Sequence, residues 1–172
     1  GVCGGPVDGF FPAGQQFYTA SSGTSHSTPA IAGGAALLRQ YFLNHGLAAP
    51  SPAMTKAFLM GSARYLTGAD AGDTLPSNAQ GMGLLDLGLA FDGTPRVLRD
   101  QVAADMFTAT GQTRTFSGSV TDTSRPYRVT LAWTDAPGST TGNAFRNDLD
   151  LTVRVGSVTD IRADDLAATE AE

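Results

Sequence analysis

The chain has little with which to crosslink itself or to cross a membrane. Cys3 is the only cysteine among 172 residues, so no disulfide can form within the chain. This does not reveal the compartment, because a partner cysteine could lie outside these residues. The longest apolar run, counted with its glycines, covers residues 30–38 and is too short to span a bilayer. We therefore expect no membrane partner.

Positive charge is also scarce. The chain has 11 basic residues against 16 acidic ones, a net charge of −5, and Lys56 is its only lysine. Without a basic run, the sequence has no electrostatic footprint for nucleic acid. Its composition, 41% hydrophobic and 16% charged, is that of a globular protein. The chain begins with Gly1 and has no signal peptide, so we interpret it as an excerpt of a longer protein.

The first part of the sequence predicts loops and helices. Residues 9–23 form a Pro/Gly-punctuated loop, and a helix follows from about Ser27 to Asn44. This helix is apolar on most sides, which predicts that it is buried, and Gly46 suits a left-handed cap after it. A second helix should begin at Ser51-Pro52 and run to about Ala63. Residues 78–91 predict a glycine turn and a short amphipathic helix.

The pattern changes near residues 92–96, where we place a boundary between units 1–94 and 95–172. Residues 113–120, 127–133 and 148–155 alternate polar and apolar side chains, as antiparallel strands do. The last residues, 159–172, are acidic and show no strand pattern. This second part should hold four or five strands, fewer than the seven or so of a complete sandwich. Its strand 148–155 would then be an exposed edge, prone to pairing with another chain.

The stretch SSGTSHSTPAIAGGAA, residues 21–36, has the features of a nucleophile at a helix start. Gly23 allows a tight backbone turn, and Ser25 follows it at the N-terminus of the helix. There, backbone N–H groups and the helix dipole favour developing negative charge. Pro29 should lie close to the first turn, where its missing N–H costs least.

These residues resemble the active-serine signature of subtilisin-like serine proteases, the subtilases: Gly-Thr-Ser, three residues, Pro, then a small-residue helix. Three further stretches are similar to subtilase segments: FFPAGQQFYTASSGTS before the serine, QGMGLLDLGLA after it, and VTLAWTDAPGSTTGNAFRNDLDL in a C-terminal β-sandwich. The matches span about residues 7–155. The resemblance implies an α/β subtilisin-like catalytic domain fragment followed by an incomplete antiparallel β-sandwich.

The resemblance also implies the chemistry. Ser25 would be the nucleophile of a secreted serine endopeptidase that cleaves protein or peptide substrates through an acyl-enzyme, with no cofactor needed for the reaction. Ser21, Ser22 and Gly23 would border the substrate. His26 and Ser27 depart from the commonest family pattern, Met and Ala. His26 is adjacent to the serine and His45 lies about 30 Å along the helix, so we interpret both histidines as structural.

The groups that would activate Ser25 are not in this sequence. Subtilases present their triad in the chain order Asp, His, Ser, but the residues before Ser25 include one acid, Asp8, and no histidine. No asparagine occurs before Asn44 to serve as the oxyanion donor. We therefore expect the chain alone to be inactive and to need the remainder of the catalytic domain.

Two other functions fit parts of the sequence. The chain could be a non-enzymatic binding or stabilising module in which Ser25 merely caps a helix. An α/β-hydrolase esterase is disfavoured, because its Gly-x-Ser-x-Gly elbow would need glycine where Ser27 stands.

The strand 148–155 carries a possible metal site. Alternation puts Leu149, Leu151 and Val153 on one face, to pack against Leu131 and Trp133, with Asp148, Asp150 and Thr152 on the other. The candidate ligands for a structural Ca²⁺ are Asp135, Asn147, Asp148 and Asp150. A solvated polar face with turn-capping aspartates is the alternative, and the residues favour it.

Overall fold

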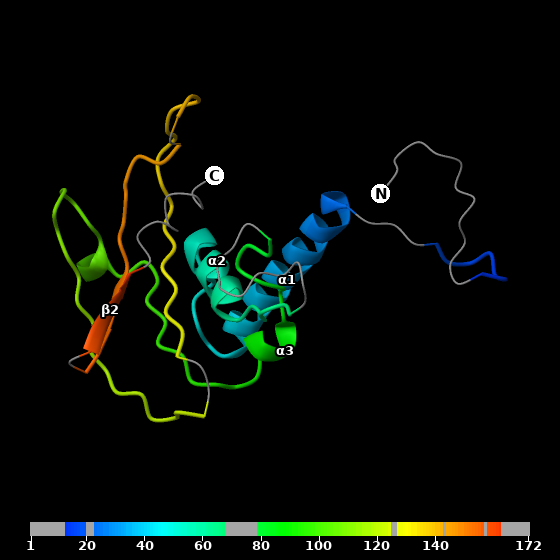
Figure 1. The fold of residues 1–172 in the computed structure, drawn as a ribbon, viewed down its shortest axis with the longest axis horizontal. Helices are drawn as coiled ribbons and strands as arrows, with labels where there is room; N and C mark the ends of the chain where they lie inside the picture. Colours follow the sequence, from blue (N-terminus) through cyan, green and yellow to red (C-terminus); the bar gives the residue numbers. More distant parts are fainter. Residues whose placement is uncertain are drawn as a thin grey trace.

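The computed structural model describes residues 13–19, 23–67, 79–124, 127–142, 144–156 and 158–162, the last range by its backbone alone. Its elements are α1 (Thr24–Asn44), α2 (Pro52–Gly61), α3 (Leu87–Ala90), the 3₁₀ turn η1 (Ala103–Asp105), β1 (Thr152–Val155) and β2 (Val158–Arg162). The three α-helices lie together, and η1 and the strands lie to one side of them (Figure 1). None of the described helices is long and apolar enough to cross a membrane.

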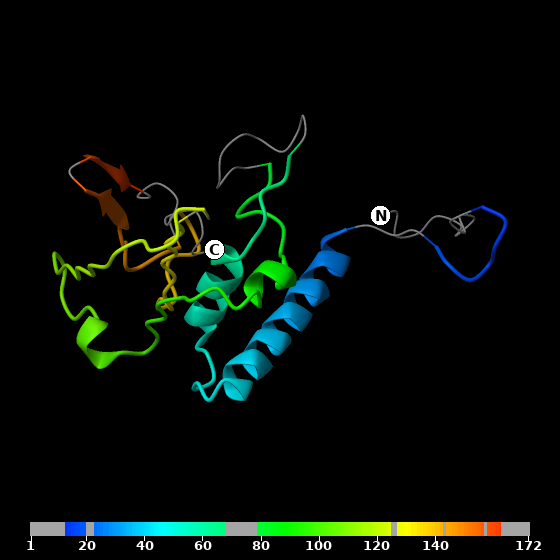
Figure 2. The same cartoon turned by 90° about the horizontal axis from the view of Figure 1, so that it is seen from below.

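The hydrophobic core lies where the three helices meet. The aromatic rings of Phe42 on α1 and Phe58 on α2 meet edge to face, with their centroids 5.6 Å apart. Tyr41 stacks on Phe91, just after α3, at 4.9 Å. The buried members of this cluster are Leu38, Phe42, Met54, Phe58, Leu59 and Ala90. Figure 2 shows α2 and α3 packed beside α1 towards its C-terminal half.

The local signals at the first two helices produce the predicted turns. After α1, Gly46 has a φ of +70°, which confirms the left-handed residue expected there. Ser51 is the N-cap of α2, and its hydroxyl oxygen accepts a hydrogen bond from the Met54 N–H at 3.0 Å. Pro52 occupies the first helical position. The helix ends at Gly61, slightly before the expected Ala63.

The glycine turn before α3 is also confirmed. Gly81 and Gly83 both have positive φ, and Gly83 packs tightly against the Arg64 carbonyl. Arg64 and Leu84 form an isolated antiparallel bridge there. Asp86 then caps α3 by accepting from the Leu89 N–H at 3.1 Å. The helix that follows has only four residues.

The prediction that the first helix is buried on most sides is wrong for the described structure. α1 begins at Thr24, three residues before the expected start, and its residues up to Gly33 are all exposed. Only Gly34, Leu38 and Phe42 are buried on it. The reason is that the helices cover just one side of its C-terminal half.

The described residues after 94 contain one two-stranded antiparallel sheet, β1 with β2, rather than the predicted four or five strands. No strand forms in the described parts of 113–120 and 127–133, so the expected partner strand at Leu131 and Trp133 is missing. β2 lies at the start of the acidic tail, where no strand was predicted. It pairs with the strand that we expected to be an open edge, with Val153 opposite Ile161. A β-sandwich is therefore not seen in the described residues.

The predicted alternation along 148–153 is nevertheless confirmed. Leu149, Leu151 and Val153 are half-buried, whereas the residues between them are exposed. Residues 127–134 are extended and run beside α2 (Figures 1 and 2). There it is the polar side chains of Arg128 and Thr130 that approach the end of the helix.

Candidate active site

Ser25 is the second residue of α1, just after a backbone conformation that favours glycine. Gly23 is the N-cap residue and has a φ of +143°, which L side chains rarely adopt. A Cβ at Gly23 would meet nothing within 4 Å, so the conformation and not lack of space makes glycine suitable. Ser25 is therefore exposed in the first turn of a long helix, where negative charge is favoured.

No side chain caps this helix start among the described residues. The Gly23 carbonyl accepts from the backbone N–H of His26 at 3.0 Å and of Ser27 at 3.3 Å. The Ser27 hydroxyl also donates to this carbonyl, at 3.5 Å. Ser25 lies inside the helix and does not occupy the N-cap position, which is held by Gly23. The helix-cap interpretation of Ser25 thus has no support in this geometry.

Pro29 lies further inside α1 than the sequence indicated. Because the helix begins at Thr24, Pro29 falls in the second turn and not the first. A proline has no N–H to donate to the carbonyl four residues earlier, and here that carbonyl belongs to Ser25. The helix therefore lacks the backbone hydrogen bond that the Ser25 carbonyl would accept from residue 29.

The two histidines are placed as the sequence indicated. His26 follows Ser25 on the helix, where neighbouring side chains point about 100° apart. His45 lies just beyond the other end of α1, where its Nδ1 is 2.8 Å from the Tyr41 carbonyl oxygen and its ring lies against the Tyr41 ring. These contacts give His45 a structural role at the helix C-terminus.

The other predicted substrate residues are only partly visible. Ser21 and Ser22 lie outside the described residues, whereas Gly23 is the N-cap residue of α1.

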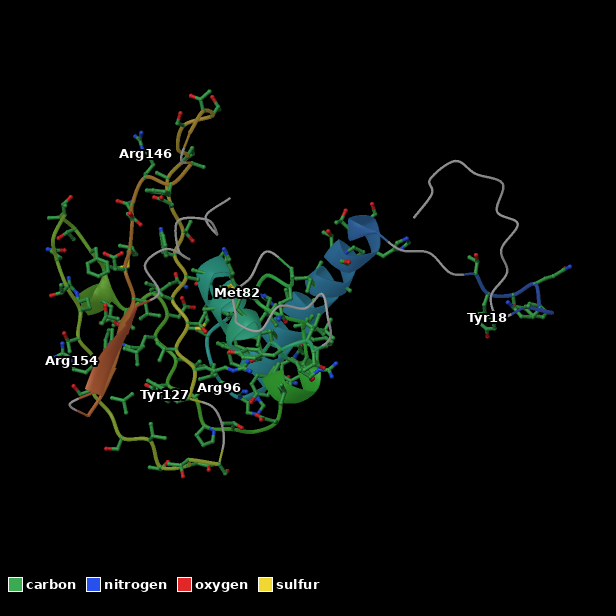
Figure 3. The ribbon with its side chains drawn as sticks, in the orientation of Figure 1. Tyr18, Met82, Arg96, Tyr127, Arg146 and Arg154 are labelled. Carbon is green, nitrogen blue, oxygen red and sulfur yellow. The ribbon has the colours of Figure 1, made fainter. Side chains whose placement is uncertain are left out.

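Sequence reasoning missed Gln15, whose side chain organises the preceding loop. Its Oε1 accepts from the N–H groups of Phe17 at 2.6 Å and Tyr18 at 2.7 Å, and its Nε2 donates to the Tyr18 carbonyl. Tyr18 projects outward from this loop, well apart from the helices (Figure 3).

The proposed calcium ligands are brought together only in part. Asp135 accepts hydrogen bonds from the N–H groups of Arg146 and Asn147 and from the Asn147 Nδ2, at 2.6 to 2.9 Å. A fourth bond comes from the Ala136 N–H at 2.8 Å. Both carboxylate oxygens thus face N–H donors, and a cation would have to displace those donors.

The pKa of Asp135 reflects the same hydrogen bonds. The backbone N–H groups of Asn147 and Arg146 lower the pKa of Asp135 to about 2, since they stabilise the charged form. Asp148 and Asp150 are exposed on the polar face of their strand. No group of three or more His, Cys, Asp or Glu side chains in the described residues could hold a metal ion. These contacts support the turn-capping alternative.

The structure thus places an exposed serine directly after Gly23-Thr24 at the start of a long helix. Residues 8–83 match the model of the Subtilase family. This match supports a fragment of a subtilisin-like serine protease. The matched segment contains Ser25, α1 and α2, and it ends before α3 and the whole C-terminal part. The chain matches no curated protein and no solved structure.

Proposed function

We propose that Ser25 is the nucleophile of a subtilisin-type serine endopeptidase, and that this chain supplies the serine-bearing part of its active site. The observation that carries the proposal is the start of α1. An exposed serine lies in its first turn behind a glycine at φ +143°, within the segment that matches the family. The family also implies protein or peptide substrates.

The proposed reaction is acyl transfer in two steps. The Ser25 hydroxyl oxygen attacks a substrate carbonyl carbon, and a histidine base accepts the hydroxyl proton. The C–N bond breaks, the amine leaves with that proton, and an ester to Ser25 remains until water hydrolyses it. The first turn of α1 would offer backbone N–H groups to the oxyanion that forms on the way.

The base and its orienting acid have to come from outside this sequence. We propose that they lie upstream, in the order Asp, His, then an asparagine for the oxyanion, before Ser25. In subtilisin, the enzyme on which such losses are measured, removing the serine or the histidine alone lowers kcat about 10⁶-fold. The chain by itself should therefore show no peptidase turnover.

A peptidase assay of two proteins tests this. The chain alone should leave a casein or peptide substrate uncleaved, and a protein that carries the upstream sequence should cleave it. Turnover by the chain alone that disappears in Ser25→Ala would contradict the dependence on upstream groups. An upstream sequence without an aspartate and a histidine in that order would contradict the triad.

Two further properties accompany this proposal. Secretion is implied by the family resemblance and would be tested by finding the protein in the medium of its host. A structural Ca²⁺ at Asp135, Asn147, Asp148 and Asp150 stays a prediction, and thermal melting with and without a chelator tests it. An unchanged melting midpoint would favour the turn-capping role of Asp135.

A further inference from the structure

We propose that α2 is an interaction surface for the C-terminal part of the same chain, so that both parts unfold as one cooperative unit. Three charged side chains of the C-terminal part, residues 95–172, make the contact: Arg96, Asp100 and Arg128. We call these three residues the α2 clamp. Figure 3 shows Arg96 beside the helices, whereas Arg146 and Arg154 lie on the C-terminal part away from them.

Asp100, the first member of the clamp, contacts the N-terminus of α2. One oxygen of the Asp100 carboxylate accepts from the Ser51 hydroxyl at 2.6 Å, and the other accepts from the Ser51 N–H at 2.8 Å. The same Ser51 hydroxyl accepts from the Met54 N–H. A continuous chain of hydrogen bonds therefore runs from the first turn of α2 through its N-cap to a carboxylate 49 residues away.

The second member, Arg128, contacts the C-terminal end of α2. The Arg128 guanidinium donates to the Gly61 carbonyl at 3.3 Å and also to the Ala63 carbonyl. Its carbon Cζ lies 4.8 Å from the centroid of the Tyr65 ring, which follows in the chain. Thr130, from the same extended segment, fills the space beside Gly61, where a Cβ would lie only 2.9 Å from its Oγ1.

The third member contacts the middle of the helix. The Arg96 guanidinium lies over the Phe58 ring, with its carbon Cζ 5.0 Å from the centroid. It also donates to the Leu89 carbonyl at 2.6 Å and pairs with Asp92 at 3.2 Å. Arg96 thereby joins the chain just after the boundary to α2 and to the end of α3.

The charges of the clamp match what α2 lacks. This helix has no acidic residue in its first turn and no basic residue in its last. A helix is stabilised by negative charge at its N-terminus and positive charge at its C-terminus. Asp100 and Arg128 supply both from the C-terminal part. The boundary at 92–96 is thus crossed by contacts at both ends of one helix, which is the basis for a single folding unit.

Two spectroscopic probes test this in the intact chain. Circular dichroism at 222 nm follows α1 and α2, whereas fluorescence follows Trp133, the only tryptophan, which lies in the C-terminal part. We expect the two urea transitions to coincide, as they do for a two-state unit. Separate midpoints for the two probes would overturn the proposal even if no variant could be prepared.

Variants then test the clamp itself. Asp100→Asn and Arg128→Gln should each raise the unfolding constant about 5- to 30-fold and shift both probes equally. The matched control is Arg39→Gln, which removes one charge from an exposed side chain and should leave both midpoints in place. A clamp variant that moves only the Trp133 transition, or neither transition, contradicts the proposal.

Discussion

Replacing Phe58 by alanine should destabilise the protein more than any exposed aromatic substitution, because this ring joins α1, α2 and Arg96. Phe58 is 6% exposed. Its ring packs edge to face on Phe42 at 5.6 Å and lies under the Arg96 guanidinium at 5.0 Å. Truncating such a buried phenylalanine costs about 3–5 kcal/mol. This is a large part of the free energy of unfolding of a typical domain, which is about 5–15 kcal/mol.

Urea unfolding followed at 222 nm measures this cost. The matched control is Phe17→Ala, because Phe17 is 88% exposed and its loss should change the free energy of unfolding by less than about 0.5 kcal/mol. If Phe58→Ala leaves too little folded protein to analyse, Phe58→Leu should cost about 1 kcal/mol by keeping most of the apolar volume. Equal costs for Phe58→Ala and Phe17→Ala would refute the three-helix core.

Two further predictions concern the turns. Asp135 has its pKa lowered from 3.8 to about 2, so the stability it contributes is complete above about pH 4 and is lost as the pH falls through about 2. Asp135→Asn should therefore lower the urea midpoint by much more at pH 7 than at pH 2, where the carboxyl is already about half protonated in the folded state; a difference independent of pH contradicts this. Gly83→Ala should cost about 1–3 kcal/mol more than Gly81→Ala, because only its Cβ would meet the Arg64 carbonyl oxygen, at 2.7 Å. Equal unfolding free energies for these two variants would exclude that contact.

The local parts of the fold were predictable because their signals are local. The Ser51-Pro52 start of α2, the left-handed Gly46 and the glycine turn before α3 each depend on a few consecutive residues. The placement of Ser25 at the start of a long helix followed in the same way from Gly23 and the small-residue run, although the helix begins at Thr24 and not near Ser27.

The long-range parts could not be read from the sequence. Alternation in residues 127–133 indicated a strand with its apolar face inward, but the contacts of Arg128 with the end of α2 turn its polar side chains towards the helix. β1 pairs with β2, which lies at the start of the C-terminal tail. The acidic composition of that tail gave no indication of a strand. Asp100 gave no local sign that it caps a helix 49 residues away.

Covalent labelling of Ser25 by a fluorophosphonate tests the central claim most directly. The protein that carries the upstream sequence is treated with the probe, and the modified peptide is located by mass spectrometry. We predict one adduct on Ser25, abolished by Ser25→Ala and retained by Ser27→Ala, which removes the neighbouring hydroxyl of the same helix turn. An absent adduct, or one that survives Ser25→Ala, would contradict the assignment of Ser25 as the nucleophile.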